Sequence, residues 1–158
     1  MLLLLLHFET GVAAQPPSAN VKPITKELFS SIRSGDAIEL EKLLADARNI
    51  LHLLKIPHRV IELCHEELGF TAAKTYDIEV WLPISKKWLE ISSCSNCEDF
   101  QSRRAQIRVK KEAKKYYPHT LNGSALAADR LIITLSEYYY NEKENCLIIP
   151  EVLQKYFY

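Results

Sequence analysis

Two cysteines at a C-x-x-C spacing are the residues that first suggest chemistry in this chain. Cys94 and Cys97 lie in the segment EISSCSNCEDFQSRR, residues 90–104. A structural zinc site needs four ligands, which means a second pair or two histidines. A redox pair normally opens a helix beside a βαβ unit. Because Cys64 and Cys146 stand alone in other segments, we expect Cys94 and Cys97 to be small packing residues.

A dense basic run follows the cysteine pair. Its members are Arg103, Arg104, Arg108, Lys110, Lys111, Lys114 and Lys115. Such a run is typical of a solvated face or of one arm of a hairpin, and it can also contact a polyanion. The sequence alone favours the solvated arm and leaves the polyanion contact open.

The totals describe an ordinary soluble globular protein of one domain. Of the 158 residues, 47% are hydrophobic and 25% are charged, with 20 basic and 20 acidic residues giving no net charge. This balance points to neither a nucleic-acid nor a membrane partner. The apolar run Leu2–Leu6 is too short to cross a membrane and lacks the basic start of a signal peptide. We therefore expect a cytoplasmic protein with reduced thiols.

One amphipathic helix is predicted over residues 38–54. Its apolar residues recur at steps of three and four, which is the spacing of one helix face: Leu40, Leu43, Leu44, Ala47, Ile50, Leu51 and Leu54. Gly35 and Asp36 are expected to cap its N-terminus, and Pro57 to prevent its continuation. Residues 1–37 are expected to form a poorly structured or divergent segment.

Alternating patterns predict an antiparallel hairpin in the middle of the chain. Residues 76–83 and 87–94 both alternate apolar and polar side chains, and the turn at 83–86 can join them. Regular alternation in the second strand would place one set of side chains on one face and the other set on the opposite face. The two sets are Trp88, Glu90 and Ser92, and Leu89, Ile91 and Ser93. Residues 58–64 predict a further strand because they are rich in β-branched side chains, and residues 105–111 predict another.

A second helix is predicted to begin after Asn122-Gly123-Ser124 and to run to about Tyr140. A small-residue turn that leads into a helix leaves free backbone N–H groups, which suit an anion. Residues 146–150 predict a last short strand. Hairpin strands with helices before and after them indicate an α+β fold, an antiparallel β-sheet flanked by helices.

Four ordered segments carry a resemblance to a known family. They are FTAAKTYDIEVWLP, KWLEISSCSNCEDFQSRRAQIR, PHTLNGSALAADRL and LIIPEVLQKYF. In this order they resemble the C-terminal part of the catalytic domain of seryl-tRNA synthetase, a class II aminoacyl-tRNA synthetase. The resemblance covers residues 38–158 and implies a partial class II catalytic core, with the family's motif 3 at about residues 119–137.

The resemblance implies roles for four residues. Glu90 and Ser93 would contact ATP, and Glu90 would help to hold a Mg²⁺ ion that the nucleotide carries. Arg130 would bind the γ-phosphate of ATP, and Ser124 would contact the substrate serine. From the residues alone, Glu90 could equally be the solvent side of a strand, Ser124 a helix N-cap and Arg130 a surface ion-pair partner. Asp129 departs from the family pattern and could either neutralise Arg130 or point to solvent.

The function implied is the ATP- and Mg²⁺-dependent activation of serine and its transfer to tRNA(Ser) by a homodimer. No counterpart of the family's tRNA-binding arm, of motif 1 at the dimer interface, or of the motif 2 arginine is visible in the sequence. We therefore expect a truncated family member that is weakly active or inactive alone. The alternatives are a non-catalytic synthetase-like protein that binds ATP or a protein partner, and a metal or thiol protein built on the cysteine pair.

Overall fold

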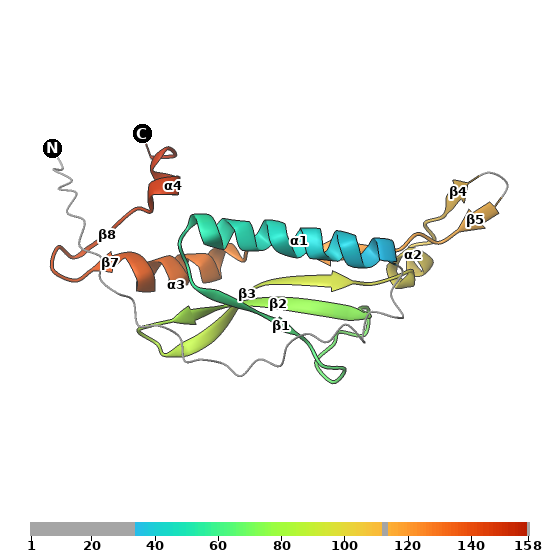
Figure 1. The fold of residues 1–158 in the computed structure, drawn as a ribbon, viewed down its shortest axis with the longest axis horizontal. Coiled ribbons are helices and arrows are strands. Elements are labelled where there is room, and N and C mark those ends of the chain that lie inside the picture. The colour runs from blue at the N-terminus through green and yellow to red at the C-terminus, as the bar shows by residue number, and fades with distance from the viewer. Residues whose placement is uncertain (1–33, 112–113, 158) are drawn as a thin grey trace.

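The computed structural model describes residues 34–111 and 114–157 (Figure 1). Within these ranges the helices are α1 (Ser34–Leu53), α2 (Phe100–Arg104), α3 (Ala128–Tyr139) and α4 (Glu151–Gln154). The strands are β1 (His58–Glu62), β2 (Lys74–Leu82), β3 (Lys87–Asn96), β4 (Val109–Lys111), β5 (Lys114–Tyr116), β6 (Leu121–Gly123), β7 (Tyr140–Asn141) and β8 (Cys146–Leu147). The prediction for residues 1–37 lies largely outside the described residues.

The main sheet is antiparallel and has the strand order β1-β2-β3-β6. The predicted hairpin is confirmed as β2 and β3, which together form the long centre of the sheet. Two small hairpins, β4–β5 and β7–β8, stand apart from it. The α+β class predicted from the sequence is therefore confirmed.

Helices α1 and α3 both lie on the same side of this sheet (Figure 1). Strand β2 alternates as predicted, and its core-facing side chains are Tyr76, Ile78, Val80 and Leu82. The α1 side chains buried against the sheet are Leu40, Leu44, Ala47 and Leu51, which belong to the predicted apolar stripe. In the part of the chain that the structure describes, no helix covers the other side of the sheet, which we call the open face.

Helix α1 begins and ends differently from the prediction. It starts at Ser34, so Gly35 and Asp36 lie in its first turn rather than before it as a cap. At its end, the Ile56 N–H donates to the Leu51 carbonyl at 2.9 Å, while Lys55 adopts a positive φ of 54°. These contacts form a Schellman-type end, so the helix stops before Pro57 is reached.

Other boundaries also differ from the sequence-based expectation. Only the last three residues of 105–111 form a strand, because α2 precedes them and Gln106 has a φ of 57°. Helix α3 starts at Ala128, since Leu121–Gly123 is still paired with β3 as strand β6. The strand predicted over 146–150 is confined to β8. The basic run divides between α2 and the hairpin β4–β5, and the described side chains of β5 are exposed.

Strand β3 contains a β-bulge. The pairing with β2 passes from Ser92 opposite Ile78 to Glu90 opposite Glu79, which leaves Ile91 without a partner. A bulge of this kind places two residues of one strand opposite one residue of the other and breaks the regular alternation.

The bulge decides which side chains of β3 share a face. Glu90 and Ser93 are three residues apart and would face opposite sides of a regular strand. Here both lie on the open face, while Ile91 and Ser92 are both buried. The predicted grouping of Ser92 with Glu90, and of Ser93 with Ile91, is therefore wrong.

Candidate functional site

The candidate site forms where the chain before and within α3 runs along the edge of β3. Beyond its pairing with β6, β3 has backbone carbonyls that are free to accept hydrogen bonds. The Ser124 N–H donates to the Ser93 carbonyl at 3.1 Å, and the Ala127 N–H donates to the Ile91 carbonyl at 2.8 Å. These two contacts fix residues 124–130 against the strand that carries Glu90.

Glu90 and Arg130 meet at this edge. Arg130 Nη1 lies 3.1 Å from Glu90 Oε1 and donates to the Glu90 backbone carbonyl at 2.9 Å. The two side chains are 44% and 39% exposed, so the pair is open to solvent. The contacts in the structure use one nitrogen of the guanidinium, which leaves its other N–H groups to face a ligand.

Ser93 and Ser124 form the second pair of the site. The Ser93 N–H donates to Ser124 Oγ at 3.2 Å, and the buried Ser92 hydroxyl donates to the Ser124 carbonyl at 2.6 Å. The interpretation of Ser124 as a helix N-cap is wrong, because Ala127 occupies that position and α3 begins at Ala128. The Ser124 side chain is instead held exposed beside β3.

Asp129 does not neutralise Arg130 in the structure. Its side chain is exposed in the first turn of α3, and the ion pair of Arg130 is made with Glu90. A carboxylate in a first helical turn is favourable toward the helix dipole. Of the two alternatives left open by the sequence, the solvent-facing one is confirmed.

Three further residues of the open face were not singled out from the sequence. Glu79 lies opposite Glu90 and Asp77 opposite Ser93 in the β2–β3 register. Arg59 of β1 binds Glu79 at 2.6 Å and lies 4.0 Å over the Trp88 ring. The alternation of β2 places Asp77 and Glu79 on the open face, but their partners in β3 depend on the bulge.

The cysteine pair lies in the core and not in the candidate site. Cys94 and Cys97 are 0% and 3% exposed, and both are free thiols. Burial raises the pKa of each thiol above its usual value. Their interpretation as packing residues is confirmed. The described residues contain no group of three or more His, Cys, Asp or Glu side chains arranged to hold a metal ion.

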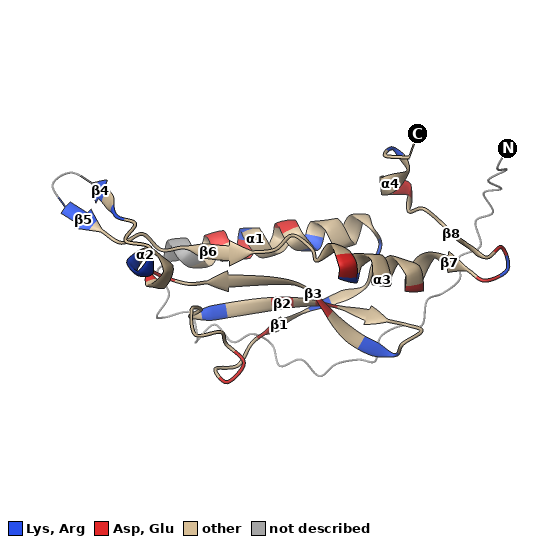
Figure 2. Cartoon of the chain, turned by 180° about the vertical axis from the view of Figure 1, so that it is seen from behind, with Lys and Arg blue, Asp and Glu red and all other residues tan. Residues whose placement is uncertain are grey.

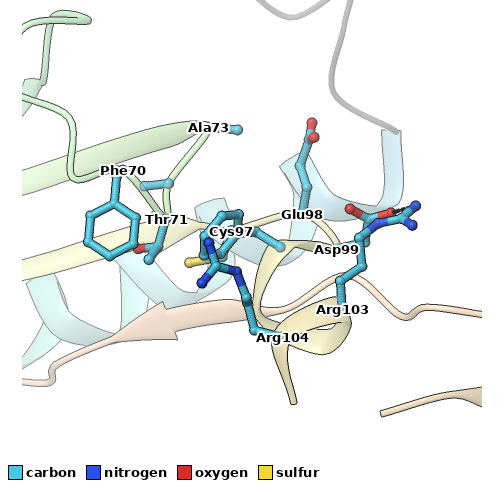
Figure 3. Close-up of a pocket in the computed structure, with 10 residues that line it drawn as sticks. Phe70, Thr71, Ala73, Cys97, Glu98, Asp99, Arg103 and Arg104 are labelled. Atoms are coloured by element: carbon cyan, nitrogen blue, oxygen red, sulfur yellow. Dashed lines mark hydrogen bonds and ion pairs between the residues drawn. The ribbon is translucent and has the colours of Figure 1, made fainter. Parts of the chain in front are cut away.

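A separate pocket of about 420 Å³ lies past the end of β3 (Figure 3). Phe70 and Phe100 contribute its aromatic side chains, with their ring centroids 5.8 Å apart. Arg103 is paired with Asp99 at 2.6 Å, as Figure 3 shows, so much of the charge in this pocket is already balanced. The four sequence-predicted site residues lie elsewhere, on an open surface and not in this pocket.

Comparison with known proteins places this arrangement in a family. The model of the tRNA synthetase class II core domain (G, H, P, S and T) matches residues 24–139. The chain belongs to this class II tRNA synthetase core-domain family.

Within that class, the chain is similar to serine–tRNA ligases. It is 52% identical to the enzyme of a Sulfurihydrogenibium species over 132 residues, and 57% identical to that of Trichormus variabilis over 120 residues. These matches cover 82% and 75% of the chain but 31% and 28% of the relatives. The chain thus spans about a third or less of the length of these relatives.

Solved structures give the same result. The seryl-tRNA synthetase of Pyrococcus horikoshii, complexed with ATP, matches with a TM-score of 0.72 at 41% identity, over 77% of this chain and 27% of that one. The cytoplasmic serine–tRNA ligase of Naegleria fowleri, in complex with AMP, also has a TM-score of 0.72, at 29% identity over 78% and 30%. The partial class II core predicted from the sequence is confirmed. No described helix is both long and apolar enough to cross a membrane.

Proposed function

We propose that this chain carries the ATP-binding part of a serine–tRNA ligase site, formed by Glu90, Ser93 and Arg130 with Ser124 beside them. The observation that carries the proposal is the meeting of Glu90 and Arg130, 40 residues apart in sequence, at a solvent-open ion pair. Arg130 presents a permanent positive charge with several N–H donors, which suits the γ-phosphate. Similarity to a synthetase complexed with ATP supports the choice of ligand.

The site chemistry is that of amino-acid activation. Attack of the serine carboxylate on the α-phosphorus of ATP releases pyrophosphate, and a cation held at the γ-phosphate stabilises that departing charge. Ser124 is exposed and rigidly placed by its contacts with Ser92 and Ser93, so its hydroxyl can contact the serine substrate. Transfer to tRNA(Ser) and assembly into a homodimer are further parts of the proposal, and they rest on the similarity to serine–tRNA ligases.

A Mg²⁺ ion fits this site only as a companion of the nucleotide. Mg²⁺ usually binds through one or two carboxylates together with substrate phosphates and water. Glu90 provides one half-exposed carboxylate, whereas Glu79 across the strand is engaged by Arg59. When bound, the ion would neutralise phosphate charge. Glu90 would hold it on the nucleotide and at the same time keep Arg130 oriented.

Titration calorimetry of MgATP with the full chain tests the proposal. We expect R130Q to weaken binding about ten- to hundredfold, as for loss of a charge-assisted hydrogen bond. E90Q should reduce the Mg²⁺ dependence of ATP affinity while changing the free energy of unfolding by less than about 1 kcal/mol, because the ion pair is solvent-exposed. The control is R104Q, an exposed arginine of the separate pocket. Loss of ATP binding in R104Q but not in R130Q would refute the assignment.

A further inference from the structure

The segment 103–119, which we call the basic arm, concentrates the positive charge of a chain that is neutral overall. It contains seven of the 20 lysines and arginines and one of the 20 acidic residues. Figure 2 shows blue ribbon, which marks Lys and Arg positions, at α2 and at the β4–β5 hairpin, at one end of the molecule. The rest of the chain is therefore net acidic, and the charge on the arm is a local feature that the total conceals.

The strand register within the arm sets lysine against lysine. Lys110 lies directly opposite Lys115, and Lys111 directly opposite Lys114. Like charges at directly opposed positions destabilise a hairpin. The Lys110–Lys115 pair therefore opposes the stability of the hairpin, and a bound polyanion would reduce that repulsion.

One face of the hairpin gathers its cations together. Side chains two residues apart share a face, so Arg108 and Tyr117 lie on the same face as Lys110 and Lys115. A direct contact agrees with this, since Arg108 Nη2 donates to the Tyr117 hydroxyl at 2.9 Å. We call Arg108, Lys110, Lys115 and Tyr117 the arm face. Lys110 and Lys115 are exposed and have no ion pair with any acidic residue that the structure describes.

The neighbouring arginines differ from the arm face. Arg103 is balanced by Asp99 at 2.6 Å, and the Arg104 guanidinium lies 4.9 Å over the Phe100 ring. Among the residues that the structure describes, the lysines without an acidic partner on this arm lie in the hairpin, away from the Glu90–Arg130 site in the sheet. An extended row of cations suits a ligand with repeated charges better than a single small anion.

We propose that the arm face binds the phosphate backbone of an RNA strand. Its lysines supply point charges, and Arg108 supplies a planar donor already oriented on Tyr117, so the contact would position RNA without reading its sequence. The choice of RNA among polyanions rests on the proposed function. The arm is a surface distinct from the ATP site, so one can fail without the other.

The test compares two charge-matched double variants of the full chain. K110Q/K115Q removes the lysines of the arm face, whereas K42Q/K143Q removes two exposed lysines elsewhere. Binding of a fluorescent short RNA duplex is followed by anisotropy between about 50 and 200 mM salt. We expect K110Q/K115Q to weaken binding roughly tenfold at the lower salt concentration and to reduce the log–log salt slope by about two, with K42Q/K143Q close to the parent.

Three outcomes would overturn the proposal. They are the absence of RNA binding by the parent chain, equal losses in both double variants, and tighter binding to phosphatidylserine vesicles than to RNA. MgATP affinity is measured on the same proteins, and we expect K110Q/K115Q to leave it unchanged. Loss of RNA binding in K110Q/K115Q by a chain that does not bind ATP would support the arm and refute the ATP site. ATP binding without RNA binding by the parent chain would support the ATP site and refute the proposal for the arm face.

Discussion

At the scale of single residues, two side chains of α3 connect this helix to the sheet. Arg130 contacts Glu90 of β3, and Glu137 contacts the turn that joins β2 to β3. Glu137 lies two turns after Arg130 on α3 and accepts hydrogen bonds from the Ile84 and Ser85 backbone N–H groups at 2.8 and 3.1 Å. The Ser85 hydroxyl donates to the other carboxylate oxygen. Glu137 therefore anchors α3 to the turn between β2 and β3, and so helps to place Arg130.

The Glu137 anchor should make stability depend on pH. Partial burial opposes ionisation, but the hydrogen bonds from Ser85 and Ile84 and the nearby Lys87 outweigh it, so the pKa of Glu137 is lowered. A carboxyl with a lower pKa in the folded state stabilises the fold above its unfolded pKa of about 4.5, and this stabilisation is lost as pH falls through the folded value. The parent chain should exceed E137Q in unfolding free energy by roughly 1 kcal/mol at pH 7.

Urea unfolding of both proteins at pH 7 and at successively lower pH checks this prediction. The difference between the parent and E137Q should stay constant near neutrality and shrink below about pH 4.5. E144Q, on an exposed turn, serves as the control. A difference that grows on acidification would contradict the assigned role.

At the scale of elements, long amphipathic segments were predictable and local exceptions were not. The α1 stripe and the alternation of β2 report burial directly, because each repeats with the period of its element. The bulge at Ile91 carries no such signal, since one extra residue only shifts the period. The sequence predicts too early a start for α3, because Asn122 and Gly123 have the composition of a turn. In the structure they pair with β3, a long-range contact that local sequence does not reveal. Helix α2 gives no such signal, because its five residues are too few to repeat an apolar pattern.

Gly123 of β6 lies directly against Leu43 of α1. A Cβ atom built there would lie 2.4 Å from Leu43 Cδ2 and 2.8 Å from Leu43 Cγ, so α1 packs directly on this glycine. We expect G123A to reduce the free energy of unfolding by about 1 to 3 kcal/mol through overpacking. Urea denaturation measures the loss. G69A is the matched control, because its added methyl would meet nothing within 4 Å. Equal stability of the two variants would show that Leu43 moves aside freely.

At the scale of the whole molecule, the four cysteines divide by burial into two pairs. Cys64 and Cys146 are exposed, while Cys94 and Cys97 are buried and the pKa of each buried thiol is raised by its burial. A thiol reagent at pH 8 should therefore label two positions rapidly in the native protein and the other two only when the core opens. Intact-mass measurement over time follows the labelling. Prior labelling of Cys94 or Cys97 would instead indicate the reactive pair that their spacing suggests.

The four residues named from the resemblance do come together in space, as two contacting pairs at one strand edge. Sequence reasoning could name them but could not give this geometry, which depends on the bulge and on the path of residues 124–130. Alternation places Asp77 and Glu79 on one face of β2, but it could not give their neighbours Arg59, Glu90 and Ser93, because cross-strand neighbours follow from register alone.

The edge of β3 holds Ala127 through its peptide group, since the Ala127 N–H donates to the Ile91 carbonyl, whereas Ser124 is held by both backbone and side-chain contacts. We therefore expect this contact to persist through most substitutions of residue 127, because the backbone N–H remains when the side chain changes. Proline is the exception because it has no N–H. Ala127 has a φ of −75° that proline could adopt, so A127P would remove the tie to Ile91 while the backbone angle stayed the same. The backbone contact of Ala127 therefore excludes proline at this position even though the backbone angle would permit it.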